Sequence, residues 1–373
     1  MAHYSTHVAH GVVAIAFFGA SALALTPADY IAQCDSGHME SCNNLAAMYR
    51  KGVGVEKSAT KAARLYGKAC DARYMLACGN LGGMYQYGEG VSRDPEKARA
   101  LFGSACRAGE PTACTNLGGM AERGEGGRKN AEEAGDLYEK SCRQSDMYGC
   151  INLGALYQQG DGVRRNAHKA AEYYRMACKD GYLVGCNNLG VLYAEGEGTE
   201  KNEKKAAELY GKACRADNML GCMNLGTYYA NTAQGGGDYS KAAALYDKAC
   251  GKGHAEGCYR LGETYEDDRT GQKNLSIAED SFRKACKEDY AAGCTRLGAL
   301  YESDELPHSD ASAAKYFSLA CDKDDAEGCF MLGAMIEKGK TPSTPVSTAE
   351  LYRKACRLGY GTACAAPTDA EKR

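Results

Sequence analysis

Two stretches decide the fold: Lys205-Ala-Ala-Glu-Leu-Tyr-Gly-Lys-Ala-Cys214 and, after a short break, Gly221-Cys-Met-Asn-Leu-Gly-Thr-Tyr-Tyr229. In both, apolar residues recur every three or four positions, which predicts two amphipathic helices. The break between them predicts a reversal of chain direction. The stretches therefore predict one antiparallel helix pair.

The same pattern recurs along the chain, and its cysteines mark the period. Every pair has the spacing C-x7-C, and successive pairs start 36 residues apart up to Cys286 and 35 apart after it. Such self-similarity predicts about ten repeats in a solenoid, rather than two or three globular domains. The pairs are Cys34 and Cys42, Cys70 and Cys78, Cys106 and Cys114, Cys142 and Cys150, Cys178 and Cys186, Cys214 and Cys222, Cys250 and Cys258, Cys286 and Cys294, Cys321 and Cys329, and Cys356 and Cys364.

One repeat shows where its helices begin and end. Asp94 is typical of an N-cap and Pro95 of a first turn, so we expect a helix from Pro95 to Cys106. A break follows over residues 107–111, and a second periodic stretch runs from Cys114 to a glycine stop at Gly124. Tyrosines recur four residues before the first cysteine and seven after the second, which predicts core positions.

Composition and motifs exclude several function classes. The net charge is -3, so no overall field attracts nucleic acid. The sequence contains no nucleophile elbow, H-E-x-x-H, phosphate loop or haem motif. Gly-x-Gly turns recur at positions 52, 88, 124, 160 and 196, but four of the five middle residues are acidic and repel an anion. We interpret these turns as helix ends.

The first residues differ from the repeats. Residues 11–25 are nearly all apolar or small, and Ala22-Leu-Ala24 is typical of signal peptidase sites. We therefore expect a signal peptide over residues 1–24, a solenoid over 25–366 and a tail over 367–373. No membrane span is expected after cleavage, and the protein is predicted to be secreted or periplasmic.

The repeated motifs carry a family resemblance. Ala-Cys, Gly-Cys-x-Asn-Leu-Gly-x-x-Tyr, Gly-x-Gly-Val and Lys-Ala-x-x-Leu-Tyr resemble the Sel-one-like repeat over about residues 27–364. The C-x7-C spacing in every unit is similar to the Helicobacter cysteine-rich protein branch. The resemblance implies an all-α, right-handed superhelix of helix pairs related to tetratricopeptide arrays. It also implies a link to penicillin binding and slow β-lactam hydrolysis.

The cysteine spacing has two chemical interpretations. In a continuous helix, residues eight apart are separated by about 12 Å of rise, which is beyond disulfide reach, so a disulfide requires a chain reversal. Residues such as Gly37, Gly109 and Gly181 lie between the partners and permit one. Zinc is the alternative, but there is no C-x2-C, and only His38 and His254 lie between paired cysteines. We expect ten disulfides, each worth about 2.5 kcal/mol by chain entropy, with no metal and no cofactor.

Enzymatic activity is the alternative function. Ser-x-x-Lys occurs at Ser58, Ser281 and Ser312, but neither Ser-Asp-Asn nor Lys-Thr-Gly occurs in the chain. We therefore name no catalytic residue. A weak penicillin-binding protein or β-lactamase remains the second hypothesis, and it rests on the resemblance alone.

The remaining signal is a recurrent polar surface position. We number positions from the second cysteine of each pair, so that Leu at +3, Gly at +4 and Tyr at +7 share its helix face, and +2 lies opposite. In tetratricopeptide-like arrays, this second helix lines the concave face. We predict that a groove there binds a protein or an extended peptide, although duplication without a role is the alternative. The predicted contacts at +2 are Asn44, Asn80, Asn116, Asn152, Asn188, Asn224, Arg260 and Arg296, and specificity is expected from Tyr87, Arg123, Gln159 and Glu195 at +9.

Overall fold

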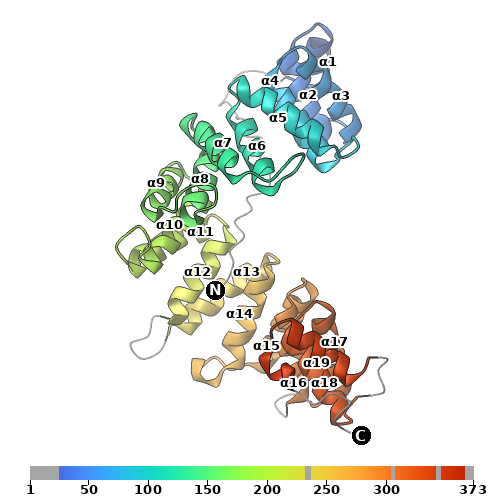
Figure 1. Cartoon of the computed structure of the whole chain (residues 1–373), viewed down its shortest axis with the longest axis vertical. Helices are drawn as coiled ribbons and strands as arrows, with labels where there is room; N and C mark the ends of the chain where they lie inside the picture. Colours follow the sequence, from blue (N-terminus) through green and yellow to red (C-terminus); the bar gives the residue numbers. More distant parts are fainter. Residues whose placement is uncertain (1–24, 232–236, 304–306, 342–345, 366–373) are drawn as a thin grey trace. The chain divides into compact units, whose positions relative to one another are not determined.

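The computed structural model describes residues 25–231, 237–303, 307–341 and 346–365. Over these residues the regular structure is entirely helical, and the chain forms two compact units, residues 1–202 and 203–373 (Figure 1). The expected signal peptide and the tail lie outside the described residues.

Helices of nearly constant length follow one another in each unit. Those of unit 1 are α1 (Pro27–Asp35), α2 (Met39–Lys51), α3 (Ala59–Asp71), α4 (Met75–Tyr87), α5 (Pro95–Arg107), α6 (Pro111–Arg123), α7 (Ala131–Arg143), α8 (Met147–Gln159), α9 (Ala167–Lys179) and α10 (Leu183–Glu195). Those of unit 2 are α11 (Glu203–Arg215), α12 (Met219–Asn231), α13 (Tyr239–Gly251), α14 (Ala255–Glu266), the 3-10 turn η1 (Asp268–Thr270), α15 (Leu275–Lys287), α16 (Ala291–Glu302), α17 (Asp310–Asp322), α18 (Ala326–Glu337), α19 (Thr348–Arg357) and α20 (Gly361–Cys364).

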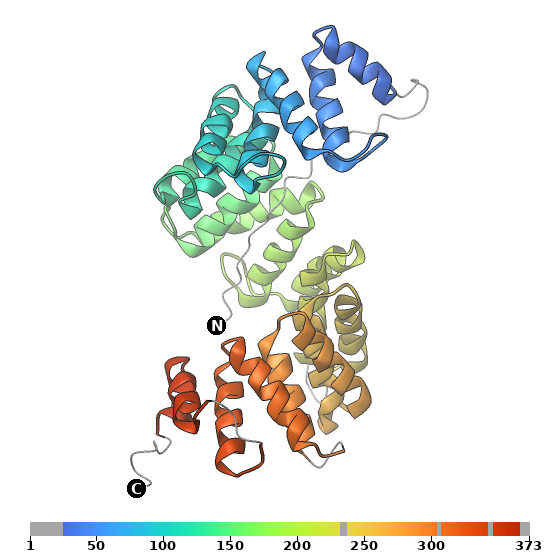
Figure 2. The same cartoon turned by 90° about the vertical axis from the view of Figure 1, so that its right-hand side faces the viewer.

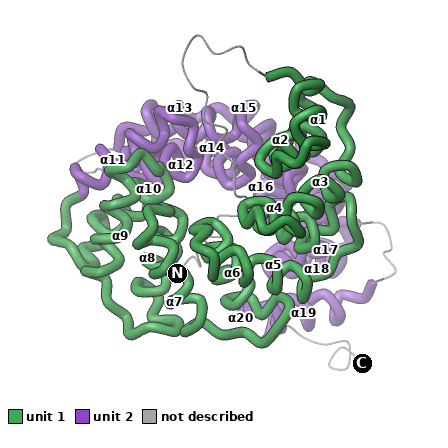
Figure 3. The backbone as a smooth tube through the Cα atoms, turned by 90° about the horizontal axis from the view of Figure 1, so that it is seen from above, with its two compact units in different colours: residues 1–202 green, residues 203–373 purple. Residues whose placement is uncertain are grey.

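Within each unit, every helix packs against the helix before it and the helix after it (Figure 2). The odd-numbered helices, here called B helices, carry the first cysteine of each pair, and the even-numbered A helices carry the second. In unit 1 the A helices lie on the inner side of the curve and the B helices on the outer side (Figure 3). The predicted all-helical solenoid of about ten helix pairs is confirmed.

The core of a repeat is an aromatic ring of the B helix laid on a glycine of the A helix. A Cβ added at Gly118 would lie 2.7 Å from Cε1 of Tyr138, and Gly82 meets Phe102 in the same way. The B-helix tyrosines are at most 5% exposed, which confirms that part of the prediction; they are Tyr66, Tyr138, Tyr174, Tyr210, Tyr246 and Tyr352.

Most tyrosines at +7 lie at the edge of the core rather than inside it, although Tyr193 is only 8% exposed, as predicted. Tyr85 and Tyr157 are only half-buried, at the edge of the core. The ammonium of Lys97 lies 4.2 Å from the ring centroid of Tyr85 and 2.7 Å from its hydroxyl. Lys169 stacks on Tyr157 in the same way, with its ammonium 4.8 Å from the ring centroid. These rings thus combine packing on one face with a cation on the other.

The turn from each B helix to the next A helix is tight. Gly109 has φ 98°, and the amide of Glu110 donates to the Ala105 carbonyl at 3.0 Å, which is a Schellman-type ending. Helix α6 begins at Pro111, three residues before the expected Cys114. Proline fits there because the first amides of a helix have no carbonyl partner within the helix.

The turn from A helix to B helix differs between early and later repeats. Gly52, Gly88, Gly124, Gly160 and Gly196 all end their helices in the left-handed region, which confirms their interpretation as helix ends. Gly126 also permits a close approach, since a Cβ there would lie 2.3 Å from the Pro95 carbonyl oxygen. In unit 2, α14 ends at Glu266, and its C-cap residue Asp267 has extended backbone instead of a left-handed glycine, so the turn after α14 has a different shape.

Candidate functional site

Ten disulfides join each B helix to the A helix that follows it. Their Cα–Cα distances are 4.4–4.8 Å, and they pair all twenty cysteines as the spacing predicts. The described residues hold no free cysteine and no group of three or more His, Cys, Asp or Glu side chains placed to bind a metal. The disulfide interpretation of the spacing is therefore confirmed.

Small residues bring the two helices close enough for these bridges. The residue before the second cysteine is usually glycine, and it faces the residue before the first cysteine. A Cβ at Gly185 would lie 2.7 Å from the Cβ of Ala177, and one at Gly293 would lie 2.6 Å from that of Ala285. Larger side chains at these positions would separate the cysteines.

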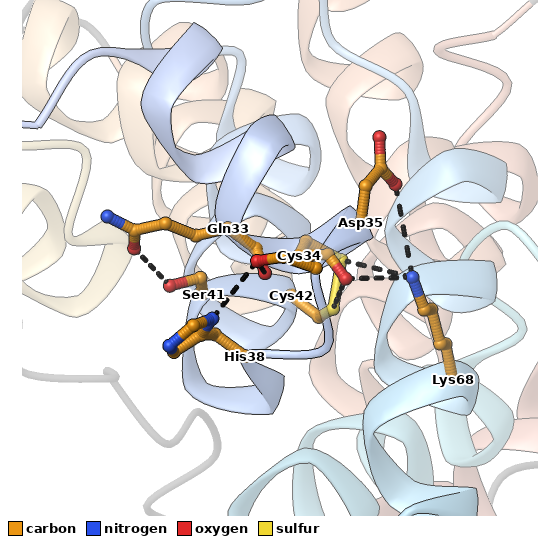
Figure 4. The surroundings of a disulfide bond; sticks show 8 residues. Gln33, Cys34, Asp35, His38, Ser41, Cys42 and Lys68 are labelled. Atoms are coloured by element: carbon orange, nitrogen blue, oxygen red, sulfur yellow. Dashed lines mark hydrogen bonds and ion pairs between the residues drawn. A yellow bond between two sulfur atoms is a disulfide. The ribbon is translucent and has the colours of Figure 1, made fainter.

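At several of these disulfides, a lysine of the next B helix donates a hydrogen bond to the backbone carbonyl of the first cysteine. The ammonium of Lys68 donates to the Cys34 carbonyl at 2.9 Å and lies 3.9 Å from Asp35 (Figure 4). A cation suits this place because the carbonyls at the end of a helix carry partial negative charge. Lys140, Lys248 and Lys354 make the same contact with Cys106, Cys214 and Cys321, at 2.9, 2.8 and 2.6 Å. Sequence reasoning missed this role, although the lysine two residues before the first cysteine recurs visibly.

The A helices present a strip of four positions on one face, spaced as i, i+4, i+7 and i+11. We call this surface of unit 1 the inner strip and define it by positions −2, +2, +5 and +9 of α4, α6, α8 and α10. Its rows are Leu76, Thr112, Tyr148 and Val184; Asn80, Asn116, Asn152 and Asn188; Gly83, Gly119, Ala155 and Val191; and Tyr87, Arg123, Gln159 and Glu195.

The asparagines are less exposed than the helical wheel suggests. Most are half-buried, and Asn188 is only 8% exposed. For Asn116, the reason is that α6 contacts the A helices on both sides of it, α4 and α8, which cover both flanks of that position. The expectation of a freely exposed row at +2 is therefore wrong, and a narrow strip remains.

The individual asparagines differ in their hydrogen bonds. The side-chain amide of Asn80 in α4 donates to the side-chain oxygen Oδ1 of Asn43 in α2 at 2.8 Å, which joins two neighbouring A helices. Within α2, the Asn43 amide donates to Oδ1 of Asn44 at 3.3 Å. Among the described residues, no hydrogen bond engages the side chain of Asn116 or Asn152. These two half-buried amides in the middle of unit 1 are available to a ligand.

The row ends differently in unit 2, where Asn224 is followed by two arginines. Arg260 contacts Glu263 at 3.1 Å and Glu256 at 3.6 Å, and Arg296 forms an ion pair with Glu266. Carboxylates of the A helices therefore already occupy both guanidinium groups. These ion pairs hold both guanidinium groups against their carboxylates, but they do not use every donor, since the buried Nε of Arg296 has no hydrogen-bond partner.

The +9 side chains are exposed, as predicted. Tyr87 is 57% exposed. Arg123 donates to Glu125 at 2.8 Å, and this hydrogen bond lowers the pKa of the Glu125 carboxyl. Burial and the neighbouring Glu197 raise the pKa of Glu195. The +9 row of the inner strip thus carries a different polar side chain in each repeat, which suits discrimination between ligands more than a uniform contribution to affinity.

The three serines of the enzymatic alternative lie in separate repeats. The Ser58 hydroxyl accepts from the Lys61 amide at 3.3 Å as an N-cap, and Ser281 is 2% exposed inside α15. Ser312 is half-buried in the first turn of α17. Among the described residues, none of these hydroxyls bonds a lysine ammonium, so the structure assembles no serine–lysine pair at these motifs.

The repeats were compared with known protein families and solved structures. The Sel1 repeat model matches residues 40–74, 76–110, 111–146, 148–182, 183–218, 220–254, 255–290, 291–325 and 326–360. A protective antigen of uropathogenic Escherichia coli with an SLR fold is 26% identical, with a TM-score of 0.60 over 90% of this chain and 72% of that one. A Sel1 repeat protein from Oxalobacter formigenes is 28% identical, with a TM-score of 0.54 over 61% of this chain and 100% of that one. No curated protein gives a significant sequence match.

Two observations bear on the compartment. Disulfides in this number indicate an oxidising, extracytoplasmic environment. Among the residues that the structure describes, no helix has the length and apolar character needed to cross a bilayer.

Proposed function

Because the chain belongs to the Sel1 repeat family, we propose that it is an exported scaffold that binds an extended peptide segment of a partner protein on the inner strip of unit 1. The observation that carries this proposal is the pair of half-buried amides without protein partners, Asn116 and Asn152. Each offers a donor and an acceptor, which match the polar groups of a peptide backbone.

The neighbouring rows leave space for a backbone. Three of the four residues at +5 are small, and a Cβ added at Gly83 would meet no atom within 4 Å, whereas one at Gly119 would lie 3.2 Å from the guanidinium of Arg123. On the other flank, Leu76 is 36% exposed, and Tyr148 and Val184 are half-buried. A peptide that crosses the helices above the small row places its main chain beside the amides and its apolar side chains against Leu76, Tyr148 or Val184.

The spacing of the helices favours one peptide conformation. Packed helices lie about 8–10 Å apart, so Asn116 and Asn152 recur at about that interval. A polyproline II peptide advances about 9.3 Å in three residues and then presents the same side again. A β-strand alternates every residue and does not present equivalent groups at this interval. The peptide is therefore expected to bind in the polyproline II conformation.

The cellular location follows from the N-terminal sequence and the disulfides. Export through a signal peptide over residues 1–24 would deliver the chain to the periplasm or the medium, where its cysteines oxidise. The mature protein should then begin at Leu25, and N-terminal sequencing of protein from the natural host tests this. A chain that retains residues 1–24 would refute the export route.

A peptide display library tests the binding surface. Peptides selected on the oxidised full-length protein should be rich in polyproline II formers. Their affinity should fall about five- to 150-fold in Asn116→Ala/Asn152→Ala, because two hydrogen bonds that together contribute about 1–3 kcal/mol are lost. The matched control is Arg260→Ala/Arg296→Ala, at the same repeat position in unit 2, which should bind normally. Equal loss in both variants, or no enrichment, would overturn the proposal.

A further inference from the structure

The ten disulfides share one geometry but differ in exposure. In the first nine pairs, the second cysteine is at most 2% exposed, whereas Cys364, the second cysteine of the tenth pair, is exposed to solvent. Its partner Cys356 is half-buried. The pair at the other end of the described chain, Cys34 and Cys42, is 1% and 0% exposed, so exposure is not a general property of the end pairs.

The exposed pair lies in an open pocket. Helix α20 has only four residues, so little of the α19 surface is covered there. A pocket of about 530 Å³ is lined by both sulfur-bearing residues together with Tyr352, Arg353, Arg357 and Ala363. Its volume is large enough for a tripeptide-sized molecule.

The pocket carries positive charge beside the disulfide. Arg353 and Arg357 are exposed, and no carboxylate of the described residues pairs with either guanidinium. Glu350 also lines the pocket, but its carboxylate accepts from the Ser347 amide at 3.1 Å as part of a capping box. Arg353 donates its Nε to the Ala349 carbonyl at 3.2 Å, so an anion that enters this pocket meets two guanidinium groups that no carboxylate of the described residues pairs, against the one carboxylate of Glu350.

We propose that Cys356–Cys364 is a thiol–disulfide exchange site for small anionic thiols of the glutathione class. The incoming thiolate attacks Sγ of Cys364, the exposed residue of the pair, and forms a mixed disulfide. The Cys356–Cys364 bond breaks, and its electron pair remains on Cys356 as a thiolate, close to Arg353 and Arg357. A second thiolate attacks the mixed disulfide, releases the oxidised small thiol and leaves Cys364 reduced. The other nine disulfides remain intact during this reduction.

A comparison of an anionic and a cationic thiol tests whether the two arginines, and not only the exposure of the disulfide, make Cys364 reactive. The oxidised full-length protein is treated with limiting reduced glutathione or with cysteamine, which is cationic, then quenched with an alkylating reagent and mapped by mass spectrometry. Glutathione should appear on Cys364 at least tenfold faster than on any other cysteine. In Arg353→Gln/Arg357→Gln, the glutathione rate should fall severalfold, while the cysteamine rate should not fall.

Three results would overturn the proposal. The first is earlier reaction of another pair, such as the half-buried Cys70 with Cys78. The second is a glutathione adduct on Cys356 instead of Cys364. The third is an equal loss of rate for both thiols in the arginine variant. Circular dichroism of the variant provides the folding control, since both arginines are exposed and a normal helical spectrum is expected.

Discussion

The glycine at +4 offers the sharpest test of how a repeat packs. In Gly118→Ala, the new Cβ would lie 2.7 Å from Cε1 and 2.9 Å from Cδ1 of Tyr138, a ring that is only 1% exposed and cannot swing into solvent. Overpacking of this kind costs about 1–3 kcal/mol. The intrinsic helix gain from glycine to alanine recovers up to about 1 kcal/mol. We therefore expect a net destabilisation of up to about 2 kcal/mol, centred on α6 and α7.

The matched control is Gly83→Ala, at +5 of α4. A Cβ at Gly83 meets no atom within 4 Å, so this variant should be stabilised by about 0.5–1 kcal/mol through helix propensity alone. Hydrogen exchange of the oxidised protein localises each effect to its repeat, because a solenoid does not unfold as a single unit. Equal protection in α6 of Gly118→Ala and wild type, or destabilisation by both variants, would refute the packing argument.

Three further predictions concern thiols, pH and turns. Alkylation of the denatured, unreduced mature protein should label none of the 20 cysteines, and more than two labelled per chain would contradict complete pairing. Burial raises the pKa of Tyr66 to about 12, whereas an unfolded tyrosine ionises near its ordinary value of 10.0. The folded state therefore loses stability as the pH rises between these two values. Because phenylalanine does not ionise, Tyr66→Phe should raise the pH at the midpoint of alkaline unfolding. Arg73 and Ser145 have φ of 65° and 66° where other repeats have glycine, so Arg73→Gly and Ser145→Gly should each raise stability by about 1 kcal/mol in chemical denaturation, and a decrease would be inconsistent with strain at these turns.

The sequence predicts the repeat well because its local signals agree. The N-cap at Asp94 and the proline at Pro95 place the start of α5 correctly, and the C-x7-C spacing, with a small residue before the second cysteine, requires the observed reversal. The start of α6 could not be read in the same way. Pro111 both ends one periodic pattern and suits a first helical turn, and only the position of the helix in space decides between these roles.

The exposure of the row at +2 was predicted less well, for a physical reason. A helical wheel describes one helix, but the exposure of position +2 depends on the neighbouring A helices, which the wheel omits. It therefore places Asn188 on an open face, although the structure buries it, and it treats Arg296 as a free donor, although Glu266 of the preceding A helix pairs with it. Contacts between repeats determine which amides remain available.

The position of the disulfides explains how neighbouring repeats are held together although their buried core is small. The Sel1 matches 40–74 and 76–110 divide the chain between Cys70 and Cys78, so that bridge joins one repeat to the next. Much of the buried core is alanine, as at Ala62 and Ala98, which contributes little apolar area per residue. In a solenoid without cross-links, neighbouring repeats are held only by such interfaces. Each covalent bridge ties a B helix to the A helix of the next repeat, so the position of Asn152 in α8 relative to α7 depends on the Cys142–Cys150 bridge as well as on the packed core.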